Sequence, residues 1–273
     1  MIGKTRQAID APRGVLVRRF DGGAFTHRRE RPSAPLAGLV EHYWHVSWDM
    51  QGGPPKVQET LPHPSVHIVV ENDVDGIYGV HTARYTRLLE GQGFAFGIKF
   101  LPAGFQPLLG SSLAAIADRK VALAAVFGDA GERYARQIRA CATVDAMIAN
   151  AEALLLAHAR APDANTARVN ALVAAIGADA SIVTVDLLAA KTGIDKRALQ
   201  RLFQRHVGVG PKWVIKRYCM HEAVAQLQSE SPPALAELAL ALGYFDQAHF
   251  INDFTALVGK PPGEYARKQL ARD

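Results

Sequence analysis

The sequence predicts a two-domain α+β protein with a β-rich N-terminal part and an all-α C-terminal part. Short apolar runs broken by Gly and Pro extend to about residue 105, helical spacing dominates after about residue 108, and one pattern recurs about fifty residues later near the C-terminus. A chain of 273 residues is long enough to bury two cores. We expect domains at residues 1–160 and 166–273, separated by a proline-containing break at 160–165.

The N-terminal half is predicted to be a β-barrel or sandwich followed by helices. Residues 41–48 alternate so that Trp44, Val46 and Trp48 share one face of a strand. Further strands are expected at 66–71, 76–80 and 94–100, a turn at 51–55, and helices at 112–117, 121–127, 131–138 and 144–159.

The C-terminal repeat predicts two helix-turn-helix units. The first copy contains Leu188, Ala189, Gly193, Phe203, Gly208 and Pro211, and the second contains Leu238, Ala239, Gly243, Phe254, Gly259 and Pro262. Glycine suits the turn of each copy because a left-handed backbone costs it little. Asp195 and Asp246 are placed to cap the second helix of each unit. Two such units, joined by a long helix over 211–228, indicate binding to adjacent segments of DNA about one turn, roughly 34 Å, apart.

The exposed positions of the two second helices predict the DNA contacts. Arg197, Gln200 and Arg201 share one face of the first, and Gln247, His249 and Asn252 are exposed on the second. Arginine matches the acceptors of guanine, and the amides of Gln and Asn match adenine. The predicted phosphate contacts are Lys196, Arg205, Lys212 and Lys260. A solvated basic face is the alternative interpretation of these residues.

The first unit is expected to bind DNA more strongly than the second. Its recognition helix carries several cations, whereas Asp253 on the second helix would repel phosphate. The repeat therefore predicts a strong reader joined to a weaker one.

The residues of the repeat resemble a known family. The pattern LA…G…LxRxF…GxxP, a long helix, and then LA…GYFDQAHF…F…GKPP…Y is similar to the AraC/XylS transcription regulators over about residues 166–267. The resemblance implies base-reading positions at Arg197, Gln200 and Arg201, and in the second unit at Gln247, Ala248, His249 and Asn252. The family usually has arginine where this chain has Asn252, which adds to the expectation that the second unit binds more weakly.

Residues 15–155 resemble a cupin-like domain found ahead of some AraC-type domains. The matching segments are residues 43–48, 61–70 and 97–104. The resemblance implies effector sensing or dimerisation. The candidate residues of an effector pocket are Trp44, Trp48, His63, His67 and Tyr78.

The N-terminal histidines leave an enzyme as the alternative function. His63 and His67 could share a metal with a third ligand in a cupin-type enzyme domain fused to the DNA-binding domain. However, His63 lies between two prolines, and no carboxylate completes a ligand pattern. The sequence also lacks a nucleophile elbow, a phosphate-binding glycine loop and an HExxH motif. We therefore expect no catalysis, metal or cofactor, and a domain that only dimerises is a third interpretation.

Composition is compatible with these expectations. The net charge is +5 and the pI about 9.3, which suits nucleic acid without requiring it. The two cysteines, Cys141 and Cys219, form no metal-type pair, and we expect a reduced cytoplasmic protein without a membrane segment or an N-terminal signal. The expected partners of this bacterial-type regulator are double-stranded DNA, a small-molecule effector, a second copy of the chain bound through the N-terminal domain, and RNA polymerase.

Overall fold

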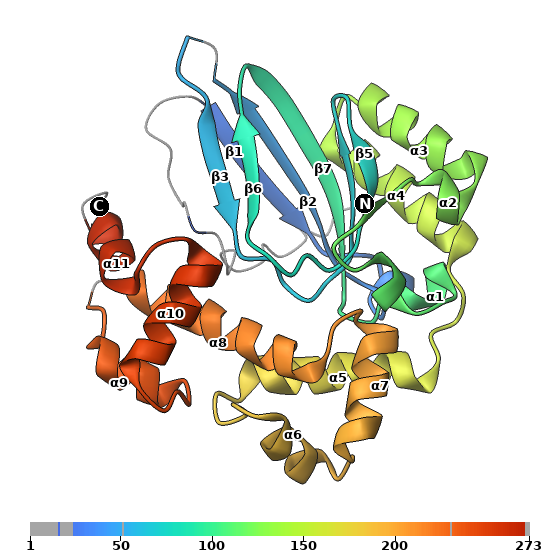
Figure 1. Ribbon diagram of the computed structural model, residues 1–273. Helices are drawn as coiled ribbons and strands as arrows, with labels where there is room; N and C mark the ends of the chain where they lie inside the picture. Colours follow the sequence, from blue (N-terminus) through green and yellow to red (C-terminus); the bar gives the residue numbers. More distant parts are fainter. Residues whose placement is uncertain (1–15, 17–23, 51, 230, 271–273) are drawn as a thin grey trace, which may run out of the picture.

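The computed structural model describes Leu16 and residues 24–50, 52–229 and 231–270. Predictions that concern residues 1–15 and 17–23, and the first residue of the turn expected at 51–55, lie outside these ranges. Within them, strands come first and helices follow, so the predicted fold class is confirmed (Figure 1).

The described N-terminal strands form a six-stranded sheet of order β1-β2-β7-β4-β5-β8 and a separate β3–β6 ribbon. All pairings are antiparallel, and β2 has a register shift between Val40 and His42. The strands are β1 (Ala24–Glu30), β2 (Val40–Asp49), β3 (Lys56–Thr60), β4 (His67–Glu71), β5 (Asp75–Tyr78), β6 (Tyr85–Leu89), β7 (Gln92–Phe100) and β8 (Lys120–Val121).

The six-stranded sheet is covered on both faces. On one face Tyr43 and Phe96 belong to a core that includes Tyr134 and Leu155 of the helices that follow. On the other face Trp48 packs with residues that include Leu89 at the end of β6. Figure 1 shows the β3–β6 ribbon in front of the sheet. We call the face that carries Trp48 the inner face.

The helices after the sheet are α1 (Gln106–Leu109), α2 (Ala124–Phe127), α3 (Asp129–Ala140) and α4 (Val144–His158), with 3-10 turns at Ala34–Leu36 and Leu113–Ile116. Two of the expected helices are wrong in part. Residues 112–117 contain only the second 3-10 turn. The helix expected at 121–127 begins at Ala124, because β-branched Val121 pairs with Ile77 and extends the sheet as β8.

The described C-terminal helices are α5 (Ala164–Ala178), α6 (Val185–Thr192), α7 (Lys196–His206), α8 (Pro211–Leu227), α9 (Leu235–Ala241), α10 (Gln247–Val258) and α11 (Pro262–Leu270). Helix α5 begins two residues before the expected domain start at 166. None of the helices in the described ranges has the length and hydrophobicity needed to cross a membrane.

Helix α8 is shared by two small helical cores. Its first half contributes Val214 to a core with Leu199 and Phe203. Its second half contributes Val224 to a core with Phe254. The two helix-turn-helix units, α6–α7 and α9–α10, are therefore built on opposite halves of one helix (Figure 1).

The helical part packs directly against the lower end of the sheet (Figure 1). Val80 and Ala103, which follow β5 and β7, are buried in the core of the first unit, and Leu61, which precedes β4, is buried in that of the second. The hydrogen bonds across this contact include Ala103 N to Asn170 Oδ1 at 2.8 Å, Arg217 Nη2 to Thr82 O at 2.5 Å, and Arg84 Nη1 to Val258 O at 2.7 Å.

Candidate nucleic-acid interface

Helix α7 is held at its start by a side-chain cap and on one face by the core. Asp195 accepts hydrogen bonds from the backbone N–H groups of Arg197 and Ala198, both at 3.0 Å. Leu199 and Phe203 are completely buried. Gly193 makes the preceding turn with φ of 67°, the left-handed conformation that favours glycine. The local structure of the first unit thus follows from the residues that predicted it.

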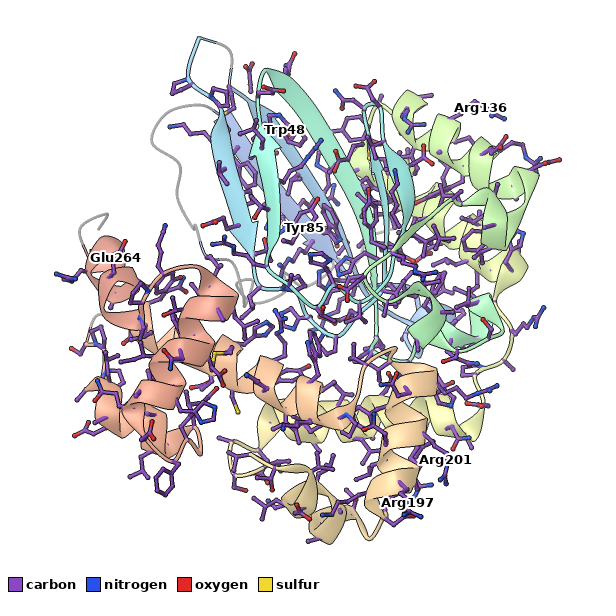
Figure 2. The ribbon with its side chains drawn as sticks, in the orientation of Figure 1. Trp48, Tyr85, Arg136, Arg197, Arg201 and Glu264 are labelled. Atoms are coloured by element: carbon purple, nitrogen blue, oxygen red, sulfur yellow. The ribbon has the colours of Figure 1, made fainter. Side chains whose placement is uncertain are left out.

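The opposite side of α7 presents the predicted base-reading residues. Arg197, Gln200 and Arg201 are all exposed, as is Arg205 further along the helix. Figure 2 shows Arg197 and Arg201 extending from α7 at the edge of the molecule farthest from the strands. Their guanidinium groups are therefore accessible to an anionic polymer.

Lys196, a predicted phosphate contact, is exposed and forms an ion pair with Asp186 of α6. An ion pair between exposed side chains contributes little to stability. The ammonium group can therefore exchange Asp186 for a phosphate, although the carboxylate competes for it.

Helix α10 repeats the same local design. Asp246 accepts a hydrogen bond from the backbone N–H of His249 at 2.7 Å, and Phe250 and Phe254 are completely buried. The predicted base-reading side chains Gln247, His249 and Asn252, together with Ala248, are exposed. Both recognition helices therefore present polar side chains in their first two turns, the part that contacts base edges in such motifs.

Asp253 was expected to repel phosphate, but its charge is partly offset by neighbouring basic side chains. Its carboxylate lies 2.7 Å from Nζ of Lys216 on α8 and 3.4 Å from Nε2 of His249. The side chain is only 21 % exposed. Since Lys216 offsets much of its charge, Asp253 gives less reason than expected for weak binding by the second unit.

Phe245, which sequence reasoning did not select, is 96 % exposed beside the cap of α10. The neighbouring Tyr244 takes the inward position, with its ring centroid 5.5 Å from that of Phe250. A pattern search for charged and amide side chains passes over such a residue. An apolar side chain can nevertheless contact the methyl group of thymine in the major groove.

The remaining predicted phosphate contacts lie near the starts of the helices that follow the recognition helices. Lys212 is exposed in the first turn of α8, and Lys260 is half-buried two residues before α11 begins at Pro262. Backbone N–H groups at a helix start attract phosphate, so both lysines are near a second source of positive potential.

Helix α8 buries two basic side chains. Arg217 is 1 % exposed, and its guanidinium lies 4.5 Å from the Trp213 ring centroid. His221 is also buried, with Nε2 at 3.0 Å from the carbonyl oxygen of Leu61. These groups contact the N-terminal domain, a contact that helical periodicity alone cannot reveal.

The five candidate effector-pocket residues lie in two places. Trp44, His67 and Tyr78 are half-buried on three strands, with His67 and Tyr78 opposite each other across β4 and β5. Trp48 lies further along the inner face, and its Nε1 donates to the carbonyl oxygen of Glu90 at 3.2 Å. His63 precedes β4 and lies apart, with its ring 4.1 Å from that of His221.

The ring of His63 lies against His221 of α8, whereas that of His67 lies 6.3 Å from Trp44 on the inner face. Across the residues whose placement is described, no group of three or more His, Cys, Asp and Glu side chains could hold a metal ion. The inner face and α8 thus divide the histidines between two different environments.

Two family models match this chain. Residues 28–122 match a family described as a domain of unknown function, and residues 188–268 match one described as a helix-turn-helix domain. The fold and the exposed recognition helices define a two-domain protein with a double helix-turn-helix. Its C-terminal domain is of the type found in AraC-family transcriptional regulators.

A curated relative agrees with this assignment. The HTH-type transcriptional regulator GlxA of Rhizobium meliloti (strain 1021) is 35% identical over 81 residues, which are 30% of this chain and 25% of that protein. The chain therefore matches only about a quarter of that curated relative's length.

Two solved structures are also similar to this chain. A probable AraC family transcriptional regulator from Rhodopseudomonas palustris CGA009 is 28% identical, with 36% of this chain and 93% of that chain covered and a TM-score of 0.32. A single-residue variant of apo ToxT from Vibrio cholerae strain SCE256 is 10% identical, with 82% and 97% covered and a TM-score of 0.35.

Proposed function

We propose that this protein is a sequence-specific DNA-binding transcription regulator. The observation that carries the proposal is the pair of capped, exposed recognition helices, α7 and α10, built on the two halves of α8. Arg197, Gln200 and Arg201 read bases through the first unit. Gln247, His249 and Asn252 read them through the second.

Phosphate contacts supply most of the affinity that does not depend on sequence. Lys196, Arg205, Lys212 and Lys260 serve this role, since each carries a cation on or beside the helices that would meet DNA. The first unit binds DNA more strongly than the second in this proposal, because α7 presents three exposed arginines and α10 presents none.

Selection of a binding site from random DNA tests the proposal directly. The selected duplex should bind far more tightly than a scrambled one at the same salt concentration. Arg201→Ala should cost roughly 1–3 kcal/mol and relax the preference at one base pair. Arg136→Ala, an exposed arginine on α3 shown in Figure 2, is the matched control and should bind normally.

A uniform loss of affinity across all sequences would make Arg201 a phosphate contact instead. Equal binding to selected and scrambled DNA would contradict sequence-specific recognition and with it the proposed function.

The N-terminal domain supplies regulation and assembly in this proposal. It binds a small-molecule effector, dimerises and so pairs two DNA-binding domains on one site in the cytoplasm, where RNA polymerase is the further partner. Its direct packing against both helix-turn-helix units supports coupling, because an effector that favours one packing also changes DNA affinity. Light scattering over a concentration series tests the dimer, and a monomer at all concentrations would contradict it.

The metal-dependent enzyme has no supporting observation among the described residues. Metal analysis of the purified protein separates the two functions. Stoichiometric metal that is lost in His67→Ala would favour the enzyme over the regulator.

A further inference from the structure

The inner face of the sheet gathers basic and aromatic side chains at one end. His42, Lys99 and His67 lie side by side across β2, β7 and β4, and Arg29 lies opposite Trp44 across β1 and β2. Because side chains alternate along a strand, all five belong to the face that also carries Trp48. We call these five residues the inner-face cluster.

The inner-face cluster contains more positive than negative charge. Lys99 is 7 % exposed, and its Nζ lies 2.9 Å from Oε1 of Glu41, the carboxylate beside the cluster. Arg29 is half-buried, and within the described ranges its side chain has one hydrogen bond, from Nε to Nε2 of His27 at 3.3 Å. One carboxylate therefore faces two cations in a poorly solvated place, where an unpaired charge is unfavourable.

The protonation states agree with this count. Burial opposes ionisation of Glu41, but the hydrogen bond from His42 and the charge of Lys99 lower its pKa to about 2. Burial, followed by the charge of Lys99, lowers the pKa of His67 to about 3. At neutral pH Glu41 is therefore charged and His67 is not. Burial lowers the pKa of Lys99 and of Arg29, the two strongly basic groups of the cluster, and the charge of Glu41 opposes that shift in both.

A buried donor in the same cluster lacks an acceptor. Nε1 of Trp44 is inaccessible to solvent, and it has no hydrogen-bond partner in the described part of the chain. The indole lies over Gly97 of β7, where a Cβ atom would come within 2.1 Å of its ring carbon Cε2. The glycine thus allows the indole to lie across the strand, with its N–H in the cationic part of the face. Buried N–H groups without a partner are rare in native proteins.

We infer that the inner-face cluster binds a small organic anion, a carboxylate whose oxygens accept from Arg29, Trp44 and Lys99. Charge-assisted bonds of this kind are the strong ones in proteins. The apolar body of the ligand would lie toward Val46 and Val69, which pack with Trp48 further along the face. This inference names the effector class and so rests on the proposed function for its regulatory meaning.

The position of the cluster connects it to the DNA-binding domain. His67 of the cluster pairs with Tyr78, the last residue of β5. The residues after Tyr78 lead through buried Val80 to Thr82, whose carbonyl oxygen accepts the hydrogen bond from Arg217. Lys99 is followed at the end of β7 by Ala103, which is buried in the core of the first unit. An anion that draws these strands together would therefore act at the ends that contact α8.

The indole N–H resonances of the three tryptophans test the anion site. In ¹⁵N-labelled protein, sodium benzoate should shift the Trp44 signal, assigned with Trp44→Phe, in a saturable manner. The Trp213 signal is the internal control, because Trp213 lies on α8 and not on the inner face. Benzamide, the neutral analogue, should leave the Trp44 signal in place. Arg29→Gln should weaken benzoate binding at least tenfold, and Lys99→Met provides a second variant.

Equal shifts with benzamide and benzoate would overturn the anionic class. No shift of Trp44 by benzoate at any concentration that the protein tolerates would overturn the site. Undiminished binding in both variants would remove Arg29 and Lys99 from it. Binding of DNA is measured separately, so a protein that binds benzoate but no selected DNA keeps this site and loses the proposed function.

Discussion

Arg217 of α8 donates a hydrogen bond of 2.5 Å to the carbonyl oxygen of Thr82, and this joins the helix shared by both helix-turn-helix units to the end of the N-terminal sheet. The guanidinium is buried and lies over Trp213. Burial lowers the pKa of Arg217 to about 10, so the group remains charged at neutral pH. A charged donor in such a place makes the contact sensitive to its geometry.

Replacement of Arg217 should loosen the contact between the two domains. Arg217→Ala removes both the hydrogen bond and the packing of its side chain, and we expect the free energy of unfolding to fall by about 1–3 kcal/mol. Urea unfolding measures the change. Arg136→Ala on the exposed side of α3 should change it by less than about 0.5 kcal/mol. Equal stability of the two variants would show that the buried guanidinium contributes nothing.

The ion pair between Lys196 and Asp186 predicts opposite effects on DNA affinity. Lys196→Ala should reduce the slope of log affinity against log salt by about one unit, because one phosphate contact is lost. Asp186→Asn should strengthen binding, because it frees the ammonium and removes a nearby negative charge. Fluorescence anisotropy over a salt series measures both. A slope that is unchanged in Lys196→Ala would exclude Lys196 from the interface.

Phe245 predicts a dependence on a thymine methyl group. Phe245→Ala should weaken binding to the selected site about fourfold, as expected for loss of an apolar contact of about 0.8 kcal/mol. Replacement of the contacted thymine by deoxyuracil should weaken the wild type similarly and leave the variant unaffected. The control is Leu240→Ala, which removes a different exposed apolar side chain, on α9, and should leave the affinity unchanged. If the losses of binding free energy from Phe245→Ala and from deoxyuracil add when the two changes are combined, Phe245 and the methyl group do not interact.

His67 predicts a loss of stability in mild acid. Its pKa in the folded protein is about 3, below the ordinary 6.5, because burial and the charge of Lys99 disfavour the proton. The neighbouring His42, Glu41 and Arg29 act on it as well. Between these two pKa values, His67 therefore binds a proton in the unfolded chain but not in the folded chain. The stabilisation is complete above pH 6.5 and is lost as the pH falls toward 3.

Thermal melting between about pH 7 and pH 5 measures this dependence. The melting temperature of the wild type should fall over that range, and His67→Gln should fall less steeply. His249→Gln serves as an exposed control on α10. A parallel decline in the wild type and His67→Gln would contradict a neutral His67 in the folded protein.

Local sequence signals predicted the helix-turn-helix units well. Asp195 and Asp246 cap α7 and α10 as expected, and Leu199, Phe203 and Phe254 face the core. These features follow from spacing within about ten residues, where helical geometry decides which side chains share a face. The paired strand with Trp44 and Trp48 on one face follows from alternation in the same way.

Contacts between distant segments could not be predicted in this way. Burial of Arg217 against Thr82 depends on a contact between residues that are 135 positions apart in the chain. His63 and His67 were expected as a pair, yet β4 begins at His67 and the chain before it turns toward α8. Arg29, Trp44 and Lys99 lie on one face only because β1, β2 and β7 are neighbours in the sheet. Sequence spacing carries no information about such pairings.

Missing-nucleoside interference on the selected DNA site tests the central claim most directly, since it maps every base, adenine or guanine, that the bound protein contacts. Recognition by both units predicts two groups of interfering bases about one helical turn apart, one assigned to each helix-turn-helix unit. In Arg197→Ala and Arg201→Ala, interference at the first group should weaken while the second group remains. Binding without any interfering bases, or an unchanged pattern in both variants, would contradict recognition of DNA by α7 and α10.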